Sequence, residues 1–135
     1  MDKYLITLLA IMAWREARGE GQEGMRYVMH VLRNRVLAKW GDWDECITKR
    51  NQFSSMGTAG DGQLIVWPDD DDIGFRQVFQ KADAIFNGLD DDPTDGALYY
   101  ANLKVATSGW FFTNIVGKPS EHPMTVKLGR HTFFR

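Results

Sequence analysis

The sequence of 135 residues lacks the features that would allow an internal disulfide, a membrane span or strong attraction to nucleic acid. It contains one cysteine, Cys46, so no disulfide can form within the chain. Its longest apolar run, Tyr4–Trp14, has eleven residues, whereas a helix needs about 20 to cross a bilayer. The net charge of −2 gives no strong basic field for nucleic acid. We therefore expect no stable membrane insertion and no nucleic-acid partner.

The apolar run has the length of a signal-peptide core, but its flanks do not fit one. Asp2 and Lys3 cancel in charge before it, and Trp14-Arg15-Glu16 follows it where a cleavage site would need small residues. We expect a buried first helix, with an export or anchoring role as the alternative.

The composition is typical of one folded domain, spanning residues 1–135. Hydrophobic residues make up 44% and charged residues 25%, close to the average for globular domains. Eight Phe, five Trp and four Tyr suit a core, a carbohydrate groove, or both. Residues 96–135 carry five cationic side chains and one anionic side chain, so an anionic polymer would meet a basic surface there.

Residue spacing predicts helices in the first two-thirds of the chain and short strands after them. The predicted helices are Lys3–Arg18, Gln22–Lys39, Glu45–Lys49 and Ile73–Asn87. The apolar stripe of the second helix leaves Arg26, Arg33 and Arg35 outside it. Two to four antiparallel strands are predicted within 97–102, 109–115 and 124–134. The fold class is therefore α+β, with a small antiparallel sheet or hairpin near the C-terminus.

Several kinds of site lack their motifs. The chain has no Gly-x-Ser-x-Gly elbow and no phosphate-binding loop. His30, His122 and His131 lack the spacing of zinc ligands, so we expect no metal and no cofactor. Asp90–Gly96 lacks the order of a calcium loop and is expected to be a turn, and Asp69–Asp72 is expected to begin a helix.

The remaining chemistry-bearing group is the pair of carboxylates in the segment Glu16–Glu20 (EARGE). Glu16 ends an apolar helix just before Gly19, so its carboxyl group can be partly buried and still face a cleft. Burial favours the protonated form of a carboxyl group, which a general acid needs at neutral pH. The alternative is an ion pair between Glu16 and an arginine of the second helix.

The motifs along the chain resemble those of the cell wall hydrolase family of spore cortex-lytic enzymes. They occur in the family's order and are Glu16–Glu20, Asn34-Arg35-Val36, Gln52-Phe53-Ser54, Asp92–Tyr100 and Thr125–Phe133. Two features depart from the family pattern. Met29 stands where the family has a small residue, and Gly117–Pro123 is longer than usual.

The resemblance implies a fold similar to lytic transglycosylases and goose-type lysozyme. It also implies cleavage of the β-1,4 bond between N-acetylmuramic acid and N-acetylglucosamine in peptidoglycan, with Glu16 as the catalytic acid and base. A lytic transglycosylase uses the substrate's own C6 hydroxyl as nucleophile, so the second carboxylate of ordinary glycosidases is optional. Glu20 is then a supporting residue that holds Arg18 or a loop, or, if water is used, the second catalytic group.

Two other functions stay open: a lysozyme-like muramidase that cleaves the same bond with water, and a non-catalytic glycan-binding or virion structural module. Aromatic and amide side chains in the matched segments are candidates for binding sugar rings and N-acetyl groups. These candidates are Gln52, Tyr99, Tyr100, Asn102, Trp110, His131 and Thr125. For each, a packing role is the alternative, and one of the two adjacent tyrosines is expected in the core.

The same resemblance also implies a biological setting. We expect a monomeric phage endolysin that is made in the host cytoplasm without a clear signal peptide. It would act on the cell wall, in the periplasm, once the membrane has been permeabilised.

Overall fold

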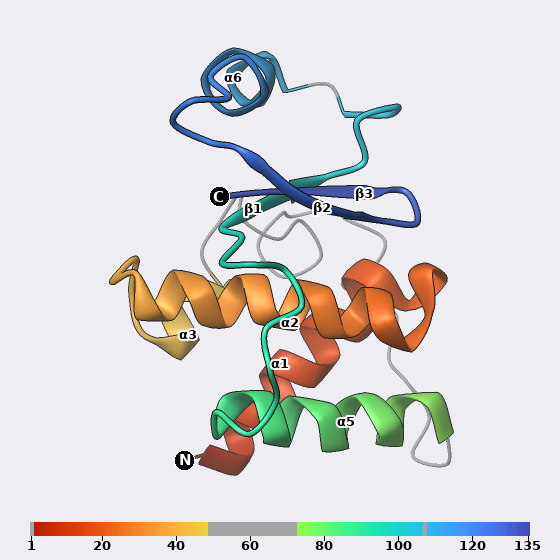
Figure 1. The fold of residues 1–135 in the computed structure, drawn as a ribbon. Coiled ribbons are helices and arrows are strands. Elements are labelled where there is room, and N and C mark those ends of the chain that lie inside the picture. Colours follow the sequence, from red (N-terminus) through yellow and green to blue (C-terminus); the bar gives the residue numbers. More distant parts are fainter. Residues whose placement is uncertain (1, 49–72, 107) are drawn as a thin grey trace.

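A computed structural model describes residues 2–48, 73–106 and 108–135. Figure 1 shows three helices, α1 (Asp2–Ala17), α2 (Gly21–Leu37) and α5 (Ile73–Phe86), beneath a small sheet. A lobe that contains the short helix α6 (Gly109–Phe111) lies above the sheet. Helix α2 lies between the sheet and the other two helices. It therefore contributes to a larger core among the helices and to a smaller core beside the sheet, which contains Val31, Ala97 and Phe133.

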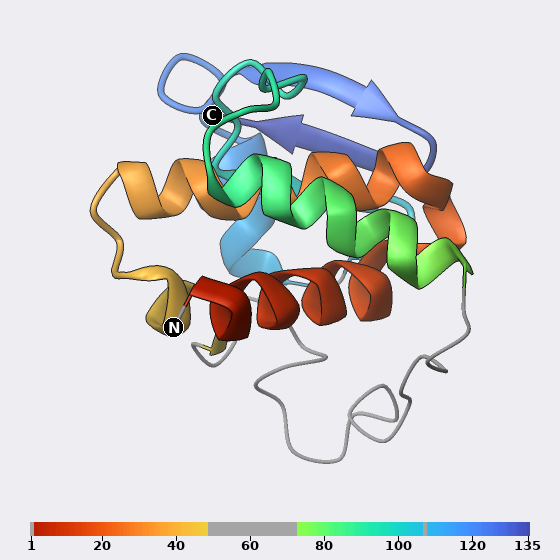
Figure 2. The same ribbon diagram turned by 90° about the horizontal axis from the view of Figure 1, so that it is seen from below.

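The larger core forms where α1, α2 and α5 pack together, as Figure 2 shows from below. Buried apolar side chains from each helix fill it, joined by Cys46 and Ile47 of α3 (Trp43–Thr48). Leu9 and Met12 of the N-terminal apolar run are fully buried. The run is therefore a buried helix, as predicted, and no helix in the described ranges is long and apolar enough to span a membrane.

Three strands form an antiparallel sheet in the order β1-β3-β2. They are β1 (Tyr99–Ala101), β2 (Met124–Leu128) and β3 (His131–Phe134), and β2 and β3 form a hairpin that turns at Gly129 and Arg130. Gly129 has φ +58°, a left-handed conformation that favours glycine. The predicted α+β class with a small C-terminal antiparallel sheet is confirmed.

The strand predicted at 109–115 is wrong. This segment forms α6 and a π-helical turn, η3 (Phe112–Val116). The Ser108 side chain accepts a hydrogen bond from the backbone N–H of Phe111 at 3.2 Å and caps the helix start. Phe111 then packs edge-on against Phe134 of the sheet. A local cap and one aromatic contact thus override the strand preference of the aromatic residues.

A second correction concerns Arg35, predicted to lie outside the buried stripe of α2. Only 6% of Arg35 is exposed, and its Nε donates a 2.7 Å hydrogen bond to the carbonyl of Leu98. The guanidinium also stacks over the Trp40 ring, 4.8 Å from its centroid. Helix α2 is buried on its sheet side as well as on its helix side. The apolar stripe identifies only the face that packs on the other helices, so it misses the face toward the sheet.

The predicted turn after α5 is pinned to α2 by a polar cluster, here called the Asp90 cluster, of Asp90, His30, Arg26 and Lys81. Asp90 Oδ2 lies 2.7 Å from His30 Nε2 and 2.8 Å from Arg26 Nε, and Oδ1 lies 3.2 Å from Lys81 Nζ. Burial alone would raise the pKa of Asp90, but hydrogen bonds from these three partners hold it far below its usual range.

Candidate functional site

The candidate acid, Glu16, lies at the C-terminal end of α1 and is partly buried. The chain leaves α1 through one 3₁₀ turn, η1 (Arg18–Glu20), and enters α2 at Gly21, where φ is +77°. Arg18 turns back onto α1, with its guanidinium carbon 4.2 Å from the centroid of the Trp14 ring. The break between α1 and α2 thus falls within the EARGE segment, as predicted.

Glu20 holds the turn between β2 and β3. Its carboxylate accepts a 2.7 Å hydrogen bond from Arg130 Nε and a 3.4 Å bond from the backbone N–H of Arg130. A Cβ atom built on Gly24 or on Gly129 would collide with Glu20, so both glycines make room for it. The contact ties the turn after α1 to the hairpin, and the supporting role of Glu20 stays a prediction.

The electrostatics of Glu20 follow from the same contact. Partial burial alone would raise its pKa, but the side-chain and backbone hydrogen bonds from Arg130 and the charge of Arg130 bring it below the usual value. Glu20 is therefore held as a carboxylate.

Tyr100 of β1 and His131 of β3 lie on one face of the sheet, with ring centroids 5.1 Å apart. Tyr100 also stacks on Phe133, its partner across the strands. Burial raises the pKa of Tyr100 well above its usual value, and the nearby charge of Glu16 raises it further. Burial lowers the pKa of His131, against the opposing charges of Glu20 and Glu16. The charge of Glu16 therefore reaches both rings.

A pocket of about 550 Å³ is lined by the residues of β1, Tyr99–Ala101, and by residues of the upper lobe. Its walls include Trp40, Tyr99 and Trp110, and Arg35 is the only charged residue among its described lining. Trp110 is 61% exposed, so much of its ring is accessible to a ligand in the pocket. A volume in this range suits a small-molecule or sugar-sized ligand.

The other predicted binding residues are placed differently. Asn102 lines a second, smaller hollow, and its Oδ1 accepts a hydrogen bond from the Lys104 backbone N–H. The Thr125 hydroxyl lies 3.4 Å from the Phe133 carbonyl, within the sheet, at an irregularity in the β2 register. Gln52 lies outside the described residues, as does the acidic run Asp69–Asp72.

Sequence reasoning missed three residues here: Arg35 and Trp40 in the large pocket, and Arg130 beside Glu20. Arg35 and Arg130 each lie inside a motif that matches the family, Asn34-Arg35-Val36 and Thr125–Phe133, so the motifs could have indicated both residues. Neither role could be assigned, because the partner in each contact is distant in sequence: Glu20 and Arg130 are separated by 110 positions.

No three His, Cys, Asp or Glu side chains within residues 2–48, 73–106 and 108–135 gather closely enough to hold a metal ion. The expectation that the chain needs no metal stays a prediction.

Known proteins are similar to this chain in sequence and fold. Spore cortex-lytic enzymes of Oceanobacillus iheyensis and Bacillus cereus are 31% and 33% identical to the chain over 131 and 132 residues, each 95% of it. The chain spans 40% and 43% of the length of these relatives. The catalytic domain of the germination-specific lytic transglycosylase SleB from Bacillus anthracis has a TM-score of 0.71 and 28% identity, over 97% of this chain and 93% of that one.

The catalytic domain of the Bacillus cereus SleB protein gives the same TM-score and identity, over 100% of this chain and 91% of that one. The family match covers residues 19–134 and so begins just after Glu16, whereas the structural likeness extends over nearly the whole chain. The chain belongs to the cell wall hydrolase family.

Proposed function

We propose that the chain is a peptidoglycan lytic transglycosylase. It would cleave the β-1,4 bond between N-acetylmuramic acid and N-acetylglucosamine and leave a 1,6-anhydro ring on the muramic acid. The observation that carries this proposal is the placement of Glu16. Glu16 lies near the end of α1, its charge reaches Tyr100 and His131, and Tyr100 is one of the residues that line the aromatic pocket. The likeness to a lytic transglycosylase catalytic domain supports the same reaction.

In the proposed reaction Glu16 acts twice. Its carboxylic acid first gives a proton to the glycosidic oxygen as the bond from that oxygen to C1 of muramic acid breaks. The C6 hydroxyl of the same sugar then attacks C1, and the Glu16 carboxylate takes the proton released from that hydroxyl. The acid is regenerated, no water is consumed, and the products are a free 4-hydroxyl and an anhydro end.

The sheet residues would serve binding and orientation. Because its pKa is raised, the Tyr100 hydroxyl stays protonated across the working pH range and can donate a hydrogen bond near Glu16. His131, with its lowered pKa, is mainly neutral at pH 7 and can exchange hydrogen bonds with a sugar without adding a charge. Tyr99 and Trp110 would stack on sugar rings in the pocket.

The contacts of Glu20 favour this reaction over hydrolysis by a lysozyme-like muramidase. A hydrolase that uses two carboxyl groups needs the second one to face a water or the anomeric carbon. Glu20 instead gives its carboxylate to the side chain and backbone of Arg130. We assign it to positioning the hairpin, and with it His131.

The setting is part of the proposal. We propose a monomeric phage endolysin that is made in the host cytoplasm and reaches the wall after membrane permeabilisation. The single cysteine supports this, because folding requires no oxidising compartment. Expressing the chain in Gram-negative cells tests the setting: the proposal predicts lysis only after a membrane-permeabilising agent is added. Lysis without that agent would contradict it.

The products test the function itself. Purified chain should release muropeptides with anhydro ends from Gram-negative peptidoglycan, as seen by mass spectrometry. Reducing ends at the same bond would establish the muramidase. Tight binding without any cleavage would establish the glycan-binding module.

A further inference from the structure

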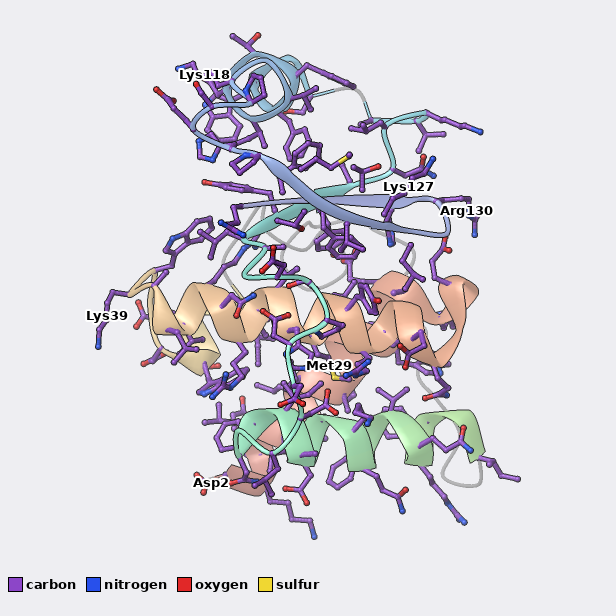
Figure 3. The ribbon with its side chains drawn as sticks, in the orientation of Figure 1. Asp2, Met29, Lys39, Lys118, Lys127 and Arg130 are labelled. Carbon is purple, nitrogen blue, oxygen red and sulfur yellow. The ribbon has the colours of Figure 1, made fainter. Side chains whose placement is uncertain are left out.

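A second hollow, here called the basic hollow, has a chemistry unlike that of the aromatic pocket. It measures about 130 Å³ and lies between the loop after β1 and the β2–β3 hairpin. Its cationic lining residues are Lys104, Lys127 and Arg130, and no carboxylate lines it within the described residues. Figure 3 shows Lys127 and Arg130 at one end of the hairpin.

The charge of the hollow does not cancel within it. Glu20, from η1, pairs with Arg130 and offsets one positive charge. Lys104 and Lys127 are both exposed, and no salt bridge is found for either within the described residues. The hollow therefore keeps about two positive charges, beside the backbone of Gly129 and the side chain of Thr132. This combination of charges and donors suits an anion.

The size of the hollow decides what kind of anion fits. Sugar-sized pockets usually start near 300 Å³, so a space of about 130 Å³ takes one small anionic group and not a ring. A single carboxylate on a flexible arm fits this description. A polymer of phosphates would need a longer basic track than these three side chains provide.

The position of the hollow relates it to the proposed reaction site. Arg130 and Thr132 flank His131 in sequence, and alternate residues of a strand point to opposite faces. The hollow thus lies on the opposite face of the hairpin from His131. The charge of Glu16 acts on the His131 ring. A peptide substituent of three extended residues reaches about 10 Å from the glycan strand, so its carboxylate need not lie on the same face of the hairpin as the sugars.

We propose that the basic hollow binds a carboxylate of the peptide stems that peptidoglycan strands carry on their muramic acids. The enzyme would then prefer strands that still bear peptides over stripped glycan. This inference rests on the proposed function, since it assumes that the strand lies beside Glu16.

The test uses the full chain and the double variant Lys104→Gln/Lys127→Gln. A matched control, Lys3→Gln/Lys118→Gln, removes the same charge from two exposed lysines outside the hollow. Figure 3 shows Lys118 well apart from Lys127. Cleavage would be measured on soluble fragments of intact peptidoglycan, on the same fragments with their peptide carboxylates amidated, and on strands stripped of peptides by an amidase.

The proposal predicts that the double variant raises KM on intact fragments by about three- to tenfold at low salt, whereas the control leaves it unchanged. The wild type should show a similar rise in KM on amidated fragments, where the double variant has no further effect. An unchanged KM on intact fragments would overturn the proposal. So would an equal loss on stripped strands, because these keep only the lactyl carboxylate.

The two proposals fail in different ways. If the wild-type chain cleaves none of the three substrates, the proposed function is wrong. If the wild type cleaves all three and the lysines make no difference on intact fragments, only the basic hollow is wrong. Matching thermal melting curves for the two double variants would show that the fold is unchanged.

Discussion

The molecule contains two groups of carboxylates close to helix ends, and they differ in what surrounds them. Asp90, after α5, is contacted by three cationic or imidazole side chains. In the other group, at the end of α1, Glu20 pairs with the exposed Arg130, and the charge of Glu16 acts on Tyr100 and His131 of the sheet. The two groups of carboxylates thus differ in their described surroundings.

The comparison shows how a site is distinguished from a structural contact. A carboxylate surrounded by cations is fixed in its charged form, so it stabilises the fold and cannot exchange a proton near neutral pH. Glu16 differs from Asp90 in that its described electrostatic neighbours include Tyr100 and His131 of the sheet. The predictions below test this difference.

The largest expected effect is on catalysis. Glu16→Gln keeps the size of the side chain and removes its proton, so we expect the cleavage rate to fall by at least about 100-fold. Thermal melting should change little. Glu23→Gln, at an exposed position of α2, is the matched control and should keep full activity. Near wild-type cleavage by the Glu16 variant would show that Glu16 is not catalytic, and the proposed functional difference between Glu16 and Asp90 would be lost.

The second prediction concerns the Asp90 cluster. Asp90→Asn weakens three charge-assisted hydrogen bonds, so we expect a loss of about 2–3 kcal/mol in the free energy of unfolding at pH 7. Activity at low temperature should persist. Asp91→Asn, an exposed neighbour, should change stability little. Chemical denaturation measures both, and full activity loss in a stable Asp90→Asn protein would contradict the structural assignment.

The effect of Asp90 should depend on pH in a defined direction. Its pKa is lower in the folded chain than in the unfolded chain. The stabilisation is therefore complete above the unfolded value of about 3.9 and is lost as the pH falls towards the folded one. The difference between wild type and Asp90→Asn should shrink below about pH 4. If the difference in the free energy of unfolding stayed constant down to pH 2, protonation of Asp90 would not be linked to stability in this way.

Glu20 should behave as an intermediate case. Glu20→Gln should lower kcat/KM by about tenfold and cost less than about 1 kcal/mol of stability, because Arg130 is 66% exposed in this pair. Arg130→Gln should have a similar effect, and the double variant should be no worse than either, since both remove one contact. A loss as large as that of Glu16→Gln, with Arg130→Gln near normal, would make Glu20 catalytic.

The smallest expected effect is at the aromatic pocket. Trp110→Ala should raise KM by about tenfold or less, through lost stacking, without changing the melting temperature. The control is Leu89→Ala, another exposed apolar residue outside the pocket. Binding assays with soluble glycan fragments would check the effect, and an unchanged KM would remove Trp110 from the site.

Much of the fold could be predicted because it follows from local patterns. Helix α1 was placed to within one residue at each end, and α5 likewise, since apolar spacing and glycines mark their limits. The segment at 109–115 could not be placed, because a serine cap and a contact to Phe134 outweigh its composition.

The candidate site could be predicted only in outline. The EARGE segment indicates Glu16 and Glu20 because it places two carboxylates beside a helix break at the end of an apolar run. The contact of Glu20 with Arg130, and the burial of Arg35 under the sheet, depend on tertiary packing that no local pattern contains.

The central claim is that Glu16 completes the reaction without water. Cleavage of peptidoglycan in water enriched with oxygen-18, followed by mass spectrometry of the products, tests it most directly. The account predicts anhydro ends that carry no oxygen-18 and are lighter than hydrolysed ends by one water molecule. Oxygen-18 at the newly formed muramic acid ends would contradict it.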